Sequence, residues 1–101
     1  MKILNFGSLN IDRVYRVAHL VRAGETISSL GYQCFPGGKG LNQSIAAARA
    51  GQKVYHAGCI GADGGFLLDT LQEGGVDTRY VRNTGGITGH ALIQVDDGGE
   101  N

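Results

Sequence analysis

The chain has 101 residues, of which 42% are hydrophobic, and this length and composition fit one small globular domain with a modest core. Nine basic residues are balanced by nine acidic ones, so there is no broad positive field of the kind that draws nucleic acid or an anionic membrane to a protein. We therefore expect neither a nucleic-acid partner nor a membrane partner.

The N-terminal segment and the cysteines argue against a secreted, membrane-spanning or metal-binding protein. The apolar run at the start of MKILNFGSLNID is interrupted by Asn5 after two residues, far too soon for a signal peptide or a membrane span. Cys34 and Cys59 lie far apart without a CxxC motif, and the histidines have no ligand-like spacing to each other or to the thiols. We expect a cytoplasmic protein with two reduced, structural cysteines and no metal site.

The first half of the chain predicts two strands and a helix. Residues 2–7 (KILNFG) form a short apolar segment that stops at a glycine, as a buried strand does. Residues 25–35 mix β-formers with polar residues, which predicts a strand in a small, half-covered sheet. Over residues 41–50, apolar residues recur at helical spacing in an alanine-rich segment, and Gly51 is placed to end this helix.

The second half of the chain continues the alternation. Residues 53–60 predict a strand, and Asp63 is placed to cap a helix that ends at Gly74 and Gly75. Residues 90–95 alternate between apolar and polar side chains as a half-buried strand does. Strands that alternate with helices favour an α/β fold, with helices packed on a parallel sheet.

The last residues predict that the domain continues beyond this sequence. The segment DDGG at 96–99 is a hairpin-turn signal, yet only Glu100 and Asn101 follow it. The predicted core strands are also fewer than the roughly four to six of a usual stable sheet. We therefore expect an N-terminal part of a longer protein, truncated after these strands. The alternative is a polar tail on a complete small domain.

The glycine-rich stretch FPGGKGLNQSIAAARAG, residues 35–51, precedes and includes the first predicted helix. It does not fit a phosphate-binding P-loop, because Gln33 stands where the first glycine belongs and Gly40 where the serine or threonine belongs. It does not fit the dinucleotide fingerprint either, because no third glycine follows Gly40 at the required spacing. The register therefore disfavours a nucleotide-binding regulatory domain.

The same loop nevertheless offers groups that could bind hydroxyls or an anion. Gly37 and Gly38 would let the backbone approach a ligand closely. The start of a helix presents N–H groups that carry about half a positive charge, and Lys39 and Asn42 add directed donors. The structural alternative is a tight turn of two glycines in which Asn42 caps the helix.

Asn10 and Asp12 follow the first predicted strand and are two residues apart. In extended chain their side chains would point the same way, at the carboxyl edge of the strand, where open α/β sheets bind ligands. A carboxylate and an amide together suit vicinal hydroxyls, each hydrogen bond contributing about 0.5–1.5 kcal/mol. The structural alternative is an Asx-type turn after the strand.

The sequence resembles the ribokinase-like (PfkB) sugar kinases over essentially its whole length. The matching segments occur in the family's order and spacing: GSLNID, GET at 24–26, GGKGLNQSIAAARAG at 37–51, CIGADGG at 59–65, GGVDT at 74–78 and TGHALI at 88–93. The 37–51 block is the most specific match. Its G-G-K-G-x-N-Q form is similar to the ribokinase branch rather than to the fructokinase or adenosine kinase branches.

The resemblance implies a sugar site and a lid. It implies substrate contacts from the residues at the two motifs and at apolar lid positions, namely Asn10, Asp12, Gly38, Lys39, Asn42, Ala91 and Ile93. The Gly37–Gly38 pair would serve as a hinge. The lid would comprise approximately residues 13–36 and 86–101, would close over the sugar to exclude water, and would pair with the lid of a second subunit in a homodimer.

The resemblance also implies what this sequence does not contain. The family's G-A-G-D motif, which carries the general base, lies with the ATP site in the C-terminal half, and GADGG at 61–65 has similar letters in a different order. We therefore expect the intact enzyme to use ATP and magnesium, and this chain to bind neither and to be inactive alone. A different class of function is a non-catalytic sugar-binding or lid-dimerisation module, because strand edges at 25–35 and 88–95 would be exposed.

Overall fold

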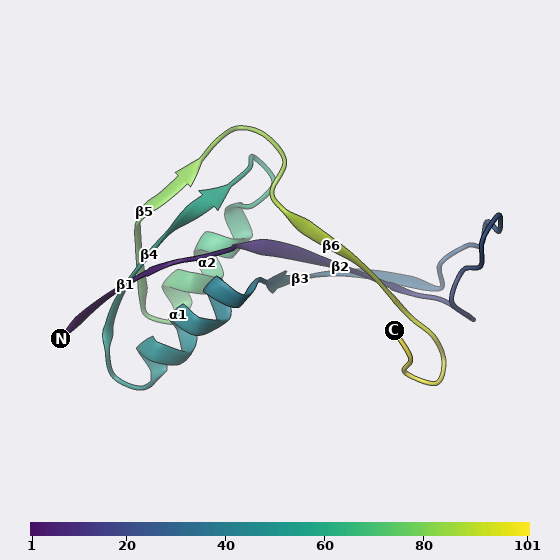
Figure 1. Ribbon diagram of the computed structural model, residues 1–101, viewed down its shortest axis with the longest axis horizontal. Helices are drawn as coiled ribbons and strands as arrows, with labels where there is room; N and C mark the ends of the chain where they lie inside the picture. The colour runs from purple at the N-terminus through teal and green to yellow at the C-terminus, as the bar shows by residue number, and fades with distance from the viewer. The chain divides into compact units, whose positions relative to one another are not determined.

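The computed structural model describes residues 1–101 and divides them into two compact units. The first unit comprises Met1–Ile11 and Pro36–Gly89, and the second comprises Asp12–Phe35 and His90–Asn101. The strands and helices of both units are labelled in Figure 1.

The first unit is built on a parallel sheet of three strands in the order β1–β4–β5. The strands are β1 (Lys2–Phe6), β4 (Lys53–Ile60) and β5 (Val76–Asn83). Parallel neighbours need crossover connections, and the helices α1 (Lys39–Arg49) and α2 (Gly65–Glu73) lie in these connections. The predicted α/β fold with a parallel sheet and packed helices is therefore confirmed.

Apolar side chains from the helices and the sheet meet in one core. Burial of this apolar surface is the main force that holds the layers together. The core residues are Leu9, Ile11, Leu41, Val54, Ile60, Leu67, Leu71 and Val76. Both helices cover the same face of the sheet (Figure 1).

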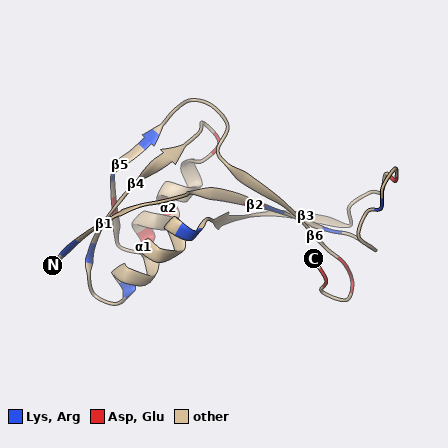
Figure 2. Ribbon diagram, viewed as in Figure 1, with Lys and Arg blue, Asp and Glu red and all other residues tan.

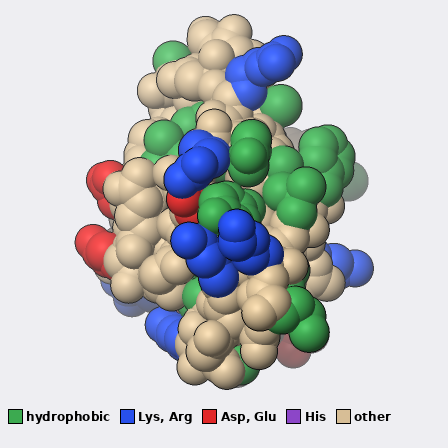
Figure 3. Space-filling model, turned by 90° about the vertical axis from the view of Figure 1, so that its left-hand side faces the viewer, with side chains coloured by type: hydrophobic (Ala, Val, Ile, Leu, Met, Phe, Trp, Pro, Cys, Tyr) green, Lys and Arg blue, Asp and Glu red, His purple; other side chains and the backbone are tan.

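The other face of this sheet is open. In β1, Ile3 and Asn5 are half-buried, whereas the alternate residues Leu4 and Phe6 are 64% and 83% exposed. Tyr80 of β5 is also exposed. Hydrophobic and basic side chains gather on the surface shown in Figure 3.

The second unit is organised by a three-stranded sheet in the order β3–β2–β6. Its strands are β2 (Asn10–Arg16), β3 (Gly31–Gly37) and β6 (His90–Val95), and the first residues of β2 and the last of β3 belong to the first unit. The rings of Tyr15 and Tyr32 lie 4.8 Å apart, centroid to centroid. This unit has few buried residues, as expected for a thin sheet.

Most predicted elements are found, with shifted limits. The strand predicted over 25–35 begins only at Gly31. Glu25, at the start of the predicted strand, instead accepts a hydrogen bond from the backbone N–H of Arg22 in a turn. The strand over 90–95 is confirmed, but its predicted alternation is wrong, since residues 90–92 are all exposed. The strands β2 and β5 were not predicted as strands.

The structure confirms the predicted turn after β6 but not the predicted cap of α2. The turn at 96–99 forms, with the N–H of Gly99 donating to the carbonyl oxygen of Asp96 at 3.0 Å. The prediction that Asp63 caps α2 is wrong. The N-cap residue is Gly64, and no side chain caps the helix. The carboxylate of Asp63 instead accepts hydrogen bonds from Thr88.

Charged and metal-binding side chains are dispersed. Figure 2 shows Lys and Arg scattered among Asp and Glu along both units. No group of three or more His, Cys, Asp or Glu side chains is placed to hold a metal ion, and Cys34 and Cys59 are unpaired and exposed. None of the helices combines the length and the apolar character needed to cross a membrane.

Candidate functional site

The glycine-rich loop before α1 packs through Gly38 against the segment between β1 and β2. This residue is the N-cap of α1 and has φ of 101°, a conformation that favours glycine. A Cβ atom here would lie 2.6 Å from the carbonyl oxygen of Ser8 and 3.2 Å from the N atom of Asn10. Only glycine therefore allows the loop to lie this close to the chain at Asn10.

The start of α1 is not capped by a side chain. The N–H of Leu41 donates to Ser8 and that of Asn42 donates to Gly38, both at 3.1 Å. Asn42 lies within the helix and does not cap it, so the structural alternative for its side chain is not observed. The N–H groups of Lys39 and Gly40 have no acceptor within the helix. They add positive character beside the exposed side chains of Lys39 and Asn42.

Asn10 lies between the glycine loop and the chain that leads into β6. It is half-buried, and its backbone N atom faces Gly38. A Cβ on Gly89 would lie 2.7 Å from the Asn10 Oδ1 atom, and the N–H of Ile11 donates to the Gly89 carbonyl at 2.9 Å. The structure thus brings Asn10, Gly38 and the first turn of α1 into one polar group.

A buried polar network lies directly under this group. Asn5 donates through Nδ2 to the carbonyl oxygen of Gly40 and to Ser44 Oγ, each at 3.0 Å. His56 contacts the carbonyl oxygen of Gly7 through Nε2 at 3.0 Å. A Cβ on Gly40 would lie 2.5 Å from the Gly7 carbonyl carbon, so backbone packs on backbone here. The network ties the end of β1 to the start of α1.

Burial lowers the pKa of His56 below its usual value, and the hydrogen bond to the Gly7 carbonyl opposes this shift only in part. The side chain is fully buried within the chain. Because a carbonyl can only accept, Nε2 carries the proton and Nδ1 accepts from the Ser44 hydroxyl. His56 is thus a neutral structural group.

Three of the predicted site residues belong to the second unit. Asp12 is half-buried on β2, and on β6 Ala91 is exposed and Ile93 half-buried. The predicted hinge residue Gly37 is buried at the end of β3. The predicted substrate-binding residues that belong to the first unit are Asn10, Gly38, Lys39 and Asn42.

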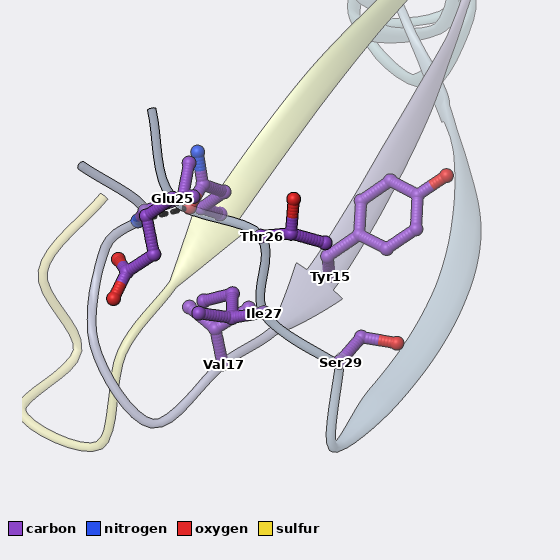
Figure 4. Close-up of a pocket in the computed structure, with 8 residues that line it drawn as sticks. Tyr15, Val17, Glu25, Thr26, Ile27 and Ser29 are labelled. Atoms are coloured by element: carbon purple, nitrogen blue, oxygen red, sulfur yellow. Dashed lines mark hydrogen bonds between the residues drawn. The ribbon is translucent and has the colours of Figure 1, made fainter. Parts of the chain in front are cut away.

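The second unit has a hollow of its own, with a volume of about 300 Å³. Val17, Ile27 and Tyr15 give it an apolar lining, and Glu25, Thr26 and Ser29 add polar groups (Figure 4). Glu25 faces His19 Nε2 at 2.9 Å, and its hydrogen bond from the Arg22 N–H, followed by the one with His19, lowers its pKa. None of the predicted sugar-binding residues lines this hollow.

Sequence reasoning missed Gly89 and the polar network. Gly89 follows a threonine in TGHALI, and only its close approach to Asn10 explains the glycine. The network had a signal in the sequence, because each member is a polar residue at a position that should be apolar. Asn5 interrupts the first apolar strand, Ser44 stands in an alanine-rich helix, and His56 stands within the strand KVYHAGCI.

Residues 1–101 match the family described as pfkB family carbohydrate kinase. The chain belongs to this family. The match covers every residue, so both units are part of it. The family resemblance inferred from the sequence motifs is therefore confirmed.

Several of the similar proteins are ribokinases. The chain is 41% identical over 98 residues to ribokinase from Haemophilus influenzae, covering 94% of this chain and 32% of that protein. The crystal structure of Cryptococcus neoformans ribokinase in complex with ADP is similar, with a TM-score of 0.91, 44% identity, and coverage of 99% of this chain and 32% of that one.

A second similar structure is a complex with ribose and ATP. Arabidopsis thaliana ribokinase complexed with ribose and ATP has a TM-score of 0.85 and 33% identity, with coverage of 99% of this chain and 33% of that one. The present chain thus spans about a third of the length of the relatives it matches.

Proposed function

We propose that this chain is the N-terminal, sugar-binding part of an ATP-dependent kinase that phosphorylates ribose or a related sugar at a primary hydroxyl. The observation that carries the proposal is the polar group around Gly38. Because Gly38 has no Cβ, the backbone of Asn10 lies close to it, at the uncapped start of α1. Its geometry suits hydroxyl oxygens. The relation to a ribokinase complexed with ribose and ATP supplies the substrate class.

The roles follow from the chemistry of each side chain. The amide of Asn10 can donate to one hydroxyl and accept from the next, and the Asp12 carboxylate can accept two hydroxyl protons. The Lys39 ammonium, the Asn42 amide and the first-turn N–H groups of α1 would donate to hydroxyl oxygens. Ala91 and Ile93 would cover the apolar side of the sugar, and the Gly37–Gly38 pair would act as the hinge.

Cofactor binding is not part of this proposal for the chain itself. ATP would supply the phosphoryl group in the intact enzyme, with magnesium as its counter-ion. The residues described here do not fit either group, because the glycine register fails and no carboxylate cluster is present. We therefore expect the cytoplasmic fragment alone to be inactive, with the general base supplied by a G-A-G-D motif elsewhere in the intact enzyme.

Titration of the 101-residue chain with ribose, followed by NMR, tests the sugar-binding proposal. We expect the backbone amides of Gly38, Lys39 and Asn42 to shift with a common saturation curve, and Asn10→Ala to abolish it. No shift at these amides, or equal shifts in the variant, would contradict the proposal. With ATP and magnesium added, formation of a ribose phosphate would contradict the expected inactivity.

The alternative function is a lid-mediated dimerisation module without catalysis. It is favoured by the apolar surface of the second unit, where Leu30, Tyr32, Phe35 and Leu92 are exposed. Residues 31–35 and 90–92 of its sheet are largely exposed. Sedimentation equilibrium of the chain tests whether it forms a dimer through this surface. A homodimer would support pairing through the lid, and a strictly monomeric folded species would contradict it.

A further inference from the structure

The loop before α2 and the segment before β6 are joined by a hydrogen-bonded clasp within the first unit. Asp63 Oδ1 accepts from the backbone N–H of Thr88 at 2.9 Å and from its hydroxyl at 2.7 Å. Thr88 Oγ1 in turn accepts from the N–H of Gly61 at 2.8 Å. The Thr88 side chain is 1% exposed. The clasp therefore connects positions that are 25 residues apart in sequence.

The backbone around the clasp is packed too closely for side chains. A Cβ on Gly61 would lie 2.2 Å from the Gly86 carbonyl oxygen, and a Cβ on Gly64 would lie 2.5 Å from Thr88 Oγ1. The N–H of Ala62 donates to Gly86 at 2.9 Å. Close packing on both sides restricts the room in which the Thr88 backbone can move, so the clasp is a buried anchor rather than a surface contact.

The anchor is one residue away from the candidate sugar site. Gly89 follows Thr88 directly, its carbonyl accepts from the N–H of Ile11, and its missing Cβ leaves room for Asn10 Oδ1. A displaced Thr88 would therefore displace the carbonyl that holds Ile11, and with it the Asn10 side chain. This chain of contacts lies entirely in the first unit.

We propose that Asp63 and Thr88 are positioning residues that hold Gly89 and thereby set the orientation of the Asn10 amide for sugar binding. The proposal rests on the proposed function, in which Asn10 contacts a hydroxyl of the sugar. Asp63 acts here through Thr88 and not as a helix cap, which explains a carboxylate placed just before an uncapped helix start.

The test uses a matched set of threonine variants of the 101-residue chain. Thr88→Val keeps the shape and removes the hydroxyl, and Thr88→Ser restores the hydroxyl. Thr70→Val is the control, because the Thr70 hydroxyl also donates within the first unit, to the Phe66 carbonyl at 3.0 Å, but does not contact Asn10 or Gly89. Two NMR readouts apply to each variant: amide hydrogen exchange at Ile11 and the side-chain NH₂ signals of Asn10.

We expect Thr88→Val to speed exchange at Ile11 at least about tenfold, because the variant loses the hydrogen bond to Asp63 and the one from Gly61, and to shift the Asn10 side-chain signals. Thr88→Ser and Thr70→Val should leave both readouts as in the unmodified chain. Unchanged readouts in Thr88→Val, or equal changes in Thr70→Val, would overturn the proposal.

A ribose titration of the same variants separates this proposal from the proposed function. If the unmodified chain binds ribose, Thr88→Val should weaken binding about tenfold, with recovery in Thr88→Ser, and unaltered affinity in Thr88→Val would overturn the positioning role. If the unmodified chain binds no ribose, sugar binding by the chain is contradicted, and the exchange and Asn10 readouts still decide whether the clasp positions Asn10.

Discussion

Ser44 Oγ and His56 Nδ1 lie 2.6 Å apart in the core of the first unit, joining helix α1 to strand β4 beneath the glycine loop. Both side chains are fully buried, and every buried polar side-chain atom of the chain has a hydrogen-bond partner. A buried polar pair of this kind fixes one arrangement of helix on sheet, because any other arrangement leaves a polar atom unpaired.

Removal of the Ser44 hydroxyl should destabilise the fold. Ser44→Ala leaves His56 Nδ1 without a donor, which costs about 1–3 kcal/mol of unfolding free energy, measured by urea denaturation. Gln43→Ala, at the neighbouring exposed position of α1, should change little. An unfolding free energy unchanged in Ser44→Ala, or lowered equally in Gln43→Ala, would argue against the hydrogen bond as the cause.

The buried histidine should make the fold sensitive to acid. The pKa of His56 in the folded chain is below the usual histidine value of 6.5, because the side chain is buried, so the unfolded chain binds the proton more tightly. Its contribution is fully present above about pH 6.5 and is lost as the pH falls through the lowered folded pKa.

Thermal melts between pH 8 and pH 5 measure this dependence. His56→Gln should flatten the acid side of the profile, whereas His90→Gln, at an exposed position, should retain it. An equally steep acid loss in His56→Gln would show that other groups are responsible.

Gly40 should tolerate no side chain. In Gly40→Ala the new Cβ would lie 2.5 Å from the Gly7 carbonyl carbon and 2.6 Å from the Ser8 N atom, and backbone atoms cannot give way cheaply. We expect a loss of about 1–3 kcal/mol or more, seen in the melting temperature. Gly65→Ala in α2 is the matched control, because nothing lies within 4 Å of its Cβ position. It should be neutral or stabilising by up to about 1 kcal/mol.

Local patterns in the sequence predicted part of the fold. Helix α1 and strand β4 were predictable, because helical spacing of apolar residues and a run of β-formers identify a core element. The strands β2 and β5 were not. Their sequences NIDRVYR and VDTRYVRN are rich in charge, and pairing with distant strands makes them strands.

The candidate site was predictable to a similar degree. Asn10, Gly38, Lys39 and Asn42 stood out by motif. The structure places Gly38 against the backbone of Asn10 and puts Lys39 and Asn42 in the first turn of α1, and their role in sugar binding stays a prediction. The role of Asp63 was predicted wrongly, because a carboxylate just before a helix usually caps it, and its partner Thr88 is far away in the sequence. No short-range pattern reveals a contact of that kind.

The central claim, that this chain is the sugar side of a kinase, is tested most directly by calorimetric titration of ribose into the unmodified chain and two aspartate variants. Asp12→Ala should weaken ribose binding about 10- to 100-fold, as expected for a hydrogen bond to a charged group, while Asp97→Ala, in the exposed turn after β6, should bind as the unmodified chain does. Equal affinity in Asp12→Ala, or no binding of ribose by the unmodified chain, would contradict the claim.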